Sequence, residues 1–234
     1  MSYFEIRESA SCLHLQFHAR ESSNAFGLAV ARELKSIIQS HKKWQKMVLV
    51  TSSHPTLFCS GGNLSDYKKL KTKAQGLKVN REITRVLDLF AVWPAPKLAV
   101  IEGDVLGGGL EWLARFDFRW STPSALFSFW QRRIGLSPGW GGGKAWAEKI
   151  GEADLRALLL EARVLSAYHA ERMGIVDRVV SGWRIQAQAE EWVEQMLRFP
   201  LKAIRQWSVQ REARVFSELW LAPDHRAVLK RWKS

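Results

Sequence analysis

The spacing of polar and apolar positions changes along the chain, and this change predicts a mixed α/β fold. Residues 12–18 place Leu13, Leu15 and Phe17 at every second position, which is the period of a strand with one buried face. The preceding segment, residues 3–7, is predicted to pair with it as a β-hairpin. Further along, compact apolar runs alternate with segments whose apolar side chains recur every three or four positions, as in amphipathic helices.

The predicted elements follow one another without an internal linker or a low-complexity tract. Short apolar runs predict strands at residues 46–52, 57–60, 98–101 and 175–180. Helical spacing predicts helices after Phe26 and over residues 77–93, 110–114, 152–162, 183–199, 201–219 and 223–230. We therefore predict a core domain at residues 1–182 and a C-terminal helical section at residues 183–234.

Two compositional features predict surface and packing rather than chemistry. Residues 68–78 hold five lysines together with Gln75 and Gly76, and we expect this stretch to be exposed and mobile. The chain also has 12 tryptophans. Three of them, Trp183, Trp192 and Trp207, fall within helical patterns, which favours packing groups over platforms that stack nucleic-acid bases.

The charge balance favours polyanionic partners. The chain has 35 Lys and Arg against 23 Asp and Glu, a formal net charge of +12. Coenzyme A and RNA are both polyanions of this kind. Because the basic residues are scattered and no RNA-recognition motif is present, the sequence favours a solvated basic surface over specific RNA binding.

Several classes of protein are excluded by composition. Two cysteines, Cys12 and Cys59, are too few for a disulfide framework, and no Cys/His spacing predicts a metal site. The first ten residues carry acids and lack the apolar core of a secretory signal. The most apolar window, residues 89–101, is broken by two prolines and a lysine, so no membrane span is predicted. We expect a cytoplasmic protein.

The densest group of glycines lies within residues 97–143. There an apolar run leads through a turn into Gly107–Gly109, which a predicted helix follows. Glycine lets the backbone approach a ligand closely, and the first N–H groups of a helix have no partner within it. This arrangement suits an oxyanion or a phosphate. Glu111 stands in the first turn of the helix, so we expect its carboxylate and these N–H groups to face one spot.

Four segments carry a more specific pattern. They are residues 24–26 (NAF), 57–67 (LFCSGGNLSDY), 107–143 (from GGGLE to RRIGLSPGWGGG) and 166–180 (SAYHAERMGIVDRVV). In this order they resemble the crotonase (enoyl-CoA hydratase/isomerase) superfamily. The resemblance implies an α/β crotonase-like fold of repeated ββα units, with C-terminal helices that cover the site and form a homotrimer or a dimer of trimers. It also implies an acyl-CoA thioester as substrate, with no additional cofactor and no metal.

The resemblance assigns roles to individual residues. The peptide N–H groups of Gly62 and Gly108 would form an oxyanion hole for the thioester oxygen, where each donor contributes about 3 to 4 kcal/mol. Contacts to substrate or coenzyme A are implied for Asn24, Ala25, Phe26, Cys59, Ser60, Gly61, Asn63, Leu64 and Gly139. Asn24 suits the N-cap of the following helix equally well, and Asn63, where the family often has Asp, is expected to cap a helix too.

The two catalytic glutamates of family hydratases match Glu111 and Gln131. An amide exchanges no proton at neutral pH, although it donates and accepts hydrogen bonds, so hydration by two carboxylates is not expected. Enolate stabilisation with at most one proton shuttle suits decarboxylation of a malonyl-type acyl-CoA or double-bond isomerisation. Residues 118–142 and 218–231 are, in addition, similar to the ethylmalonyl-CoA decarboxylase branch.

Three hypotheses stay open at this point. We favour a malonyl-type acyl-CoA decarboxylase over an enoyl-CoA hydratase or isomerase. The third hypothesis is a catalytically weak relative that binds RNA or protein through its basic surface, whose nucleic-acid affinity would fall steeply with salt. A purely structural role also stays open for Glu111, as a carboxylate held by backbone N–H groups at a helix start.

Overall fold

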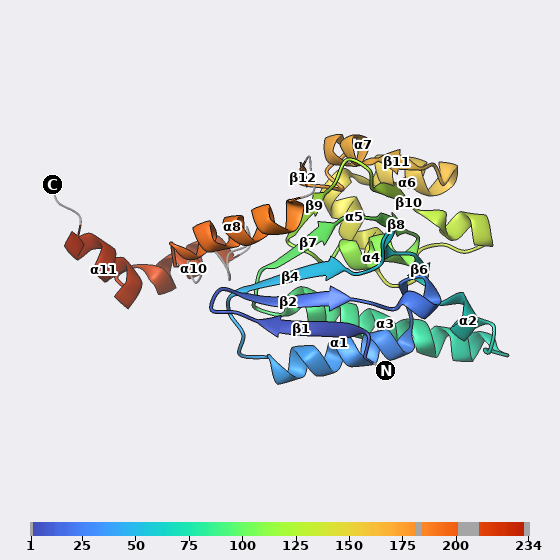
Figure 1. Cartoon of the computed structure of the whole chain (residues 1–234), viewed down its shortest axis with the longest axis horizontal. Helices are drawn as coiled ribbons and strands as arrows, with labels where there is room; N and C mark the ends of the chain where they lie inside the picture. Colours follow the sequence, from blue (N-terminus) through green and yellow to red (C-terminus); the bar gives the residue numbers. More distant parts are fainter. Residues whose placement is uncertain (1, 181–183, 201–210, 232–234) are drawn as a thin grey trace.

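A six-stranded sheet runs through the body of the protein (Figure 1). The computed structural model describes residues 2–180, 184–200 and 211–231. The strands lie in the order β1 (Phe4–Glu8), β2 (Cys12–Phe17), β4 (Met47–Ser52), β7 (Lys97–Ile101), β9 (Phe118–Ser121) and β12 (Arg178–Val179). β1 and β2 form the predicted antiparallel hairpin, and the other neighbours in this sheet are parallel.

Two smaller sheets lie beside the first one. The four-stranded sheet has the order β11 (Leu165–Ser166), β10 (Leu126–Ser128), β8 (Asp104–Leu106) and β5 (Leu57–Cys59). The third pairs β3 (Ala25–Phe26) with β6 (Gly61–Gly62) in parallel. The strand predicted over residues 175–180 is shorter than expected, since only Arg178–Val179 pair with a neighbour.

The chain repeats a ββα unit, as the resemblance implies. In each repeat one strand enters the six-stranded sheet, the next enters the four-stranded sheet, and a helix follows. The three clearest repeats are β4, β5 and α3 (Lys73–Val92), then β7, β8 and α4 (Gly108–Leu113), then β9, β10 and α5 (Gly142–Ile150). The strands of successive repeats therefore lie side by side, and so do the turns that follow them.

Both faces of the six-stranded sheet are covered. Along β4, Val48 and Val50 point into one hydrophobic cluster, whereas Met47 and Leu49 point into a second one. The first cluster lies against α1 (Leu28–Ser40), α3 and α4, and the second lies against α8 (Ile185–Leu197). Parallel strands that are buried on both faces read as continuous apolar runs, which is why residues 46–52 and 98–101 show no alternation.

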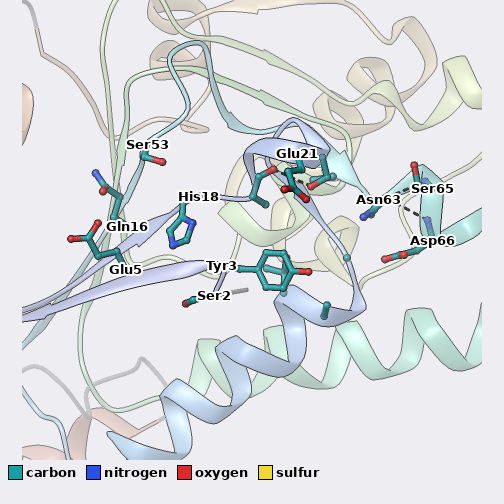
Figure 2. A pocket seen from close by; sticks show the side chains of 16 residues that line it. Ser2, Tyr3, Glu5, Gln16, His18, Glu21, Ser53, Asn63, Ser65 and Asp66 are labelled. Atoms are coloured by element: carbon teal, nitrogen blue, oxygen red, sulfur yellow. Dashed lines mark hydrogen bonds between the residues drawn. The ribbon is translucent and has the colours of Figure 1, made fainter.

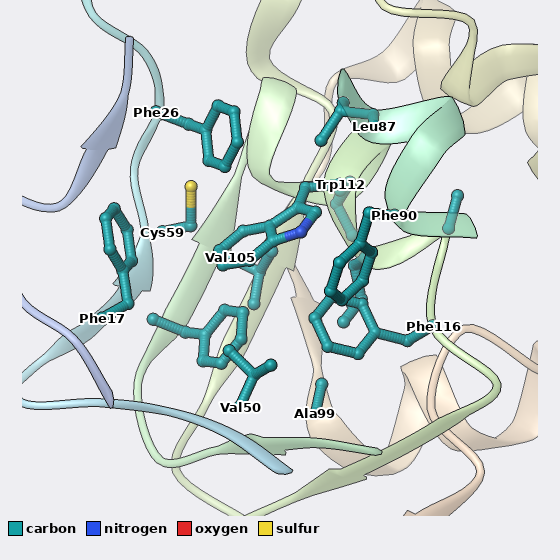
Figure 3. Close-up of a cluster of buried hydrophobic side chains, with 14 of the residues drawn as sticks. Phe17, Phe26, Val50, Cys59, Leu87, Phe90, Ala99, Val105, Trp112 and Phe116 are labelled. Carbon is teal, nitrogen blue, oxygen red and sulfur yellow. The ribbon is translucent and has the colours of Figure 1, made fainter. Parts of the chain in front are cut away.

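Trp112 is the centre of the first cluster (Figure 3). Its indole is fully buried, and the ring centroids of Phe26, Phe17 and Phe58 lie 5.0, 5.6 and 5.7 Å from it. Aromatic rings at such distances add to the free energy that their burial contributes. Because Trp112 follows Glu111 directly in α4, this packing fixes the helix that carries the predicted catalytic carboxylate.

The lysine-rich stretch is more ordered than predicted. α2 (Leu64–Tyr67) precedes it, and α3 begins at Lys73, well before the expected start at Leu77. The Thr72 hydroxyl accepts a hydrogen bond from the Gln75 N–H, and the Gln75 side chain accepts one from the Thr72 N–H. This capping box satisfies N–H groups at the start of the helix, and it was missed because the lysines dominated the pattern.

Helix α8 packs on one face of the six-stranded sheet, whereas α10 (Glu212–Leu219) and α11 (Pro223–Arg231) extend away from the body (Figure 1). Of the tryptophans predicted to pack there, Trp192 contacts Trp120 and Phe118, as expected. Trp183, Trp207 and the predicted boundary after residue 182 lie outside the described residues. Among the helices that the structure describes, none combines the length and the apolar character that a membrane crossing requires.

Candidate active site

Two glycine pairs from different repeats meet at one edge of the four-stranded sheet. β5 and β8 are parallel neighbours, and their carboxyl ends lead into Gly61–Gly62 and Gly107–Gly108. A Cβ atom on Gly61 would lie 2.9 Å from the Leu106 carbonyl oxygen and 3.1 Å from the Gly108 nitrogen. The φ angles of Gly61 and Gly107, +101° and +50°, also favour glycine. The fold thus brings together the two positions predicted to form an oxyanion hole.

The loop before α1 holds the first glycine pair in place. Ala25 pairs with Gly61, and Phe26 pairs with Gly62. Asn24, which has a φ of 52°, is fully buried, and its Nδ2 donates to Ser52 Oγ at 2.7 Å and to the carbonyl oxygens of the β5 residues 57 and 58.

The prediction that Asn24 caps a helix is therefore wrong. The N-cap of α1 is Gly27, which has no side-chain cap. The side chain of Asn24 donates instead to Ser52 Oγ and to carbonyl oxygens of β5, so it ties the loop before α1 to that strand.

The carboxylate of Glu111 accepts four hydrogen bonds and is only 2% exposed. Its Oε1 accepts from the Gly139 N–H at 3.0 Å and from Gln131 Nε2 at 3.3 Å. Its Oε2 accepts from the N–H groups of Trp140 at 2.7 Å and Gly142 at 3.1 Å. The donors belong to the loop before α5, to the first residue of α5 and to Gln131, not to the start of α4 as expected. Glu111 thus ties this loop to the core.

Gln131 lies next to Glu111, in the short helix η2 (Trp130–Ile134). It is 7% exposed. A carboxylate only accepts hydrogen bonds, so the amide must turn Nε2 toward Glu111, and Oε1 points elsewhere. Oε1 is buried and has no hydrogen-bond partner within the described residues. A buried acceptor of this kind suits a ligand or water that donates to it.

Trp140 connects the loop before α5 to the glycines. A Cβ atom on Gly108 would lie 2.4 Å from the six-membered ring of Trp140, and one on Gly62 would lie 3.0 Å from the ring of Tyr67. The Trp140 Nε1 and the Tyr67 hydroxyl both donate to Asn80 Oδ1, at 3.3 and 3.0 Å. Burial raises the pKa of Tyr67, so its hydroxyl stays a donor. The sequence analysis gave none of these three residues a role, although Tyr67 and Trp140 lie within the segments that carry the family resemblance.

These groups surround a cavity of about 130 Å³. Of the predicted site residues, it is lined by Ser60, Gly61, Gly62, Leu64, Gly108, Glu111, Gln131 and Gly139. Tyr67, Asn80 and Trp140 complete the wall, and the half-exposed side chains of Trp130, Ile134 and Leu136 lie around its opening. The structure therefore places both predicted oxyanion glycines and both predicted catalytic positions around one small space.

A second, larger hollow of about 770 Å³ is bordered by side chains of the β1–β2 hairpin, the loop before α1 and the start of α2 (Figure 2). Two predicted contact residues, Ala25 and Asn63, border it. Asn63 Oδ1 accepts from the N–H groups of the next residues, 65 and 66, and so caps α2 as predicted.

The charge of this hollow does not favour phosphate groups. The carboxylates of Glu5, Glu21 and Asp66 line it together with His18, and no lysine or arginine does so among the residues that the structure describes. The negative charge of Asp66 is partly neutralised by Lys69, whose Nζ lies 3.7 Å from Asp66 Oδ1. The side chains of the remaining predicted contacts, Asn24, Phe26 and Cys59, are buried and border neither space.

Comparison with known proteins gives a family match and several curated relatives. Residues 7–219 match the profile described as enoyl-CoA hydratase/isomerase. Ethylmalonyl-CoA decarboxylase of Rattus norvegicus is 28% identical over 229 residues, which cover 90% of this chain and 77% of that protein. The decarboxylase of Danio rerio is 31% identical over 188 residues, or 78% of this chain and 62% of that protein. A putative enoyl-CoA hydratase/isomerase, YngF of Bacillus subtilis (strain 168), is 30% identical over 173 residues, or 73% of this chain and 66% of that one. The chain therefore spans about three quarters of the first relative and less than two thirds of the other two.

Solved structures share the fold. Enoyl-CoA hydratase from Bacillus anthracis superposes with a TM-score of 0.90 at 22% identity, covering 98% of this chain and 95% of that one. A putative enoyl-CoA hydratase from Thermobifida fusca YX in complex with CoA gives a TM-score of 0.83 at 21% identity, with the same coverage. At these identities the likeness establishes the fold.

Proposed function

The chain belongs to the enoyl-CoA hydratase/isomerase (crotonase) family, and from this we propose that it decarboxylates a malonyl-type acyl-CoA thioester. The observation that carries the proposal is the environment of Glu111. Among the described residues that line the cavity, Glu111 is the one carboxylate, and three peptide N–H groups and Gln131 engage it as an acceptor. Hydration by the family route needs two carboxylates, and here an amide stands at the second position.

Decarboxylation suits a site with one carboxylate and one amide because the reaction needs no base. The bond between the α-carbon and its carboxylate breaks, carbon dioxide leaves, and the electron pair passes into the thioester enolate. In this proposal the N–H groups of Gly62 and Gly108 donate to the enolate oxygen, an effect of about 3 to 4 kcal/mol per donor. A proton from solvent then adds to the α-carbon, so one proton is consumed for each carbon dioxide released.

Two further observations support a short, carboxylated acyl group. The cavity is small, about 130 Å³, which fits a short branched acyl group better than a long chain. Two of the relatives described above are ethylmalonyl-CoA decarboxylases.

An enoyl-CoA isomerase or hydratase is the second candidate. Glu111 borders the cavity, and isomerisation needs a single group that moves one proton. One relative is a putative hydratase/isomerase. Incubating the protein with ethylmalonyl-CoA, methylmalonyl-CoA and crotonyl-CoA, and following the products by mass, separates the candidates. Loss of carbon dioxide from the first two supports our proposal, whereas addition of water to the third, with no loss from the others, overturns it.

We also propose that the C-terminal helices assemble the protein as a trimer or a dimer of trimers. They expose large apolar side chains, among them Phe199, Phe216 and Trp220 at 74%, 63% and 57%. The rings of Phe216 and Trp220 lie 5.4 Å apart, and neighbouring exposed apolar groups commonly mark an interaction site. Light scattering at micromolar concentration should give a multiple of three chains, and a clean monomer would contradict this assembly.

A further inference from the structure

The side chain of Asn80, in α3, borders the cavity together with the predicted oxyanion glycines. Its Oδ1 accepts from Tyr67 Oη at 3.0 Å and from Trp140 Nε1 at 3.3 Å. The ring of Tyr67 in turn contacts the Gly62 position, and the ring of Trp140 contacts the Gly108 position. Asn80 is therefore one hydrogen bond away from each of the two side chains that pack on the predicted oxyanion glycines.

These partners fix which end of the amide faces them. The indole N–H of Trp140 is only a donor, so the Asn80 atom beside it must be the oxygen. The nitrogen, Nδ2, then lies at the other end, beside Gly139, where a Cβ atom would be 3.2 Å from it. Within residues 2–180, 184–200 and 211–231, no group accepts a hydrogen bond from Nδ2. Nδ2 is thus an oriented donor without an acceptor.

The surroundings of Nδ2 favour a negatively charged acceptor. Asn80 and Gly139 border both the cavity and an adjoining hollow of about 440 Å³, which Arg81 and Arg85 also line. Both arginines are exposed, so they supply a positive field rather than a buried ion pair. A bound anion where the cavity meets this hollow would accept a hydrogen bond from Nδ2.

We propose that Asn80 is a specificity-determining residue, and that its Nδ2 donates to the carboxylate on the α-carbon of a malonyl-type acyl thioester. The inference rests on the proposed function. A neutral amide fits this role because it orients the carboxylate without the full charge that would oppose its loss as carbon dioxide. A hydrogen bond to a charged group corresponds to about 10- to 100-fold in affinity, so Asn80 should make the site prefer carboxylated thioesters by roughly that factor.

The test measures binding with a ligand that cannot react. 2-Sulfobutyryl-CoA carries a sulfonate in place of the carboxylate, and butyryl-CoA carries neither; calorimetry gives the dissociation constant of each. We expect the unmodified protein to prefer 2-sulfobutyryl-CoA by at least about 10-fold. In Asn80→Asp both contacts to Oδ1 are retained but the donor becomes an acceptor, so the preference for 2-sulfobutyryl-CoA over butyryl-CoA should vanish. Asn80→Ala, which removes Nδ2 without adding a charge, should also lose the preference and covers the case in which Asn80→Asp fails to fold.

Two results would overturn the role of Asn80: no preference in the unmodified protein, or a preference that both variants retain. Arg85→Gln is the matched control, since it lowers the positive field and leaves Nδ2 in place. If the preference for 2-sulfobutyryl-CoA is lost in Arg85→Gln and kept in the Asn80 variants, the positive field alone recognises the anion. Release of carbon dioxide from ethylmalonyl-CoA is measured separately. If it occurs and Asn80 has no effect, the inference alone fails. If it does not occur and the preference depends on Asn80, the proposed function fails while the anion site stands.

Discussion

Replacing Glu111 with Gln should destabilise the protein as well as change its chemistry. Glutamine keeps the size of the side chain but turns one carboxylate oxygen into an NH₂ group. If the NH₂ group takes the place of Oε2, it faces the N–H groups of Trp140 and Gly142. If it takes the place of Oε1, it faces the Gly139 N–H, while Gln131 can rotate its amide to accept from it.

The second orientation costs less free energy, so it sets the expected loss of stability. The Gly139 N–H, whose hydrogen bond to Glu111 is part-buried, then loses its acceptor, at a cost of at most about 1 to 3 kcal/mol. The two hydrogen bonds that remain at the other oxygen lose the carboxylate charge, which roughly halves their strength and costs about 1 kcal/mol each. The total is about 3 to 5 kcal/mol. In a chain of this size it corresponds to a Tm lower by about 6 to 20 °C.

Thermal unfolding followed by circular dichroism measures this difference. Glu148→Gln is the matched control, because it makes the same chemical change at an exposed position of α5 and should alter the free energy of unfolding by less than about 0.5 kcal/mol. A Tm of Glu111→Gln within about 2 °C of the unmodified protein would refute the view that Glu111 fixes the loop before α5.

The other predictions concern single groups around the cavity. Gln131→Glu places a second carboxylate beside Glu111, so crotonyl-CoA hydration should rise, by up to about 10² to 10⁴-fold, with no gain in decarboxylation; unchanged initial rates of hydration would contradict this. Gly108→Ala drives a methyl group into the Trp140 ring and should abolish turnover, and normal turnover would contradict the packing argument. Gly76→Ala is the control, because Gly76 has open space around it. This variant should keep normal turnover and stabilise α3 by about 0.5 to 1 kcal/mol in denaturant unfolding. Because burial raises the pKa of Tyr67, the stability it contributes is complete below about pH 10, the usual value for tyrosine, and is lost as the pH rises through the higher folded value. Tyrosinate absorbance should show that the component missing from Tyr67→Phe titrates above about pH 10, and a lower midpoint would be evidence against a buried hydroxyl.

Much of the fold was predictable because its signals are local. The period-two pattern of β2 and the apolar runs of β4 and β7 identified the strands of the large sheet. The α3 start was missed because the Thr72–Gln75 capping box lies inside a run of lysines. The role of Asn24 was misread because its partners lie on β5, more than thirty positions further along the chain.

The site was predictable only where a family motif marks it. Gly62, Gly108, Glu111 and Gln131 were named from such motifs, and the structure places all four around one cavity. The hydrogen bonds that immobilise Glu111 come from peptide groups, which leave no trace in residue identity. Asn80 was missed for a related reason. A single asparagine on a charged amphipathic helix is typical of solvated surface, and its contacts with the Tyr67 hydroxyl and the Trp140 indole are visible only in the structure.

The most direct measurement of the central claim follows the α-carbon during reaction with ethylmalonyl-CoA in D₂O. If carbon dioxide leaves to give an enolate that solvent then protonates, the product is butyryl-CoA with one deuterium at the α-carbon, and crotonyl-CoA under the same conditions gains water only slowly. Unreacted ethylmalonyl-CoA, together with rapid formation of 3-hydroxybutyryl-CoA from crotonyl-CoA, would contradict the account and show that Glu111 alone suffices for hydration.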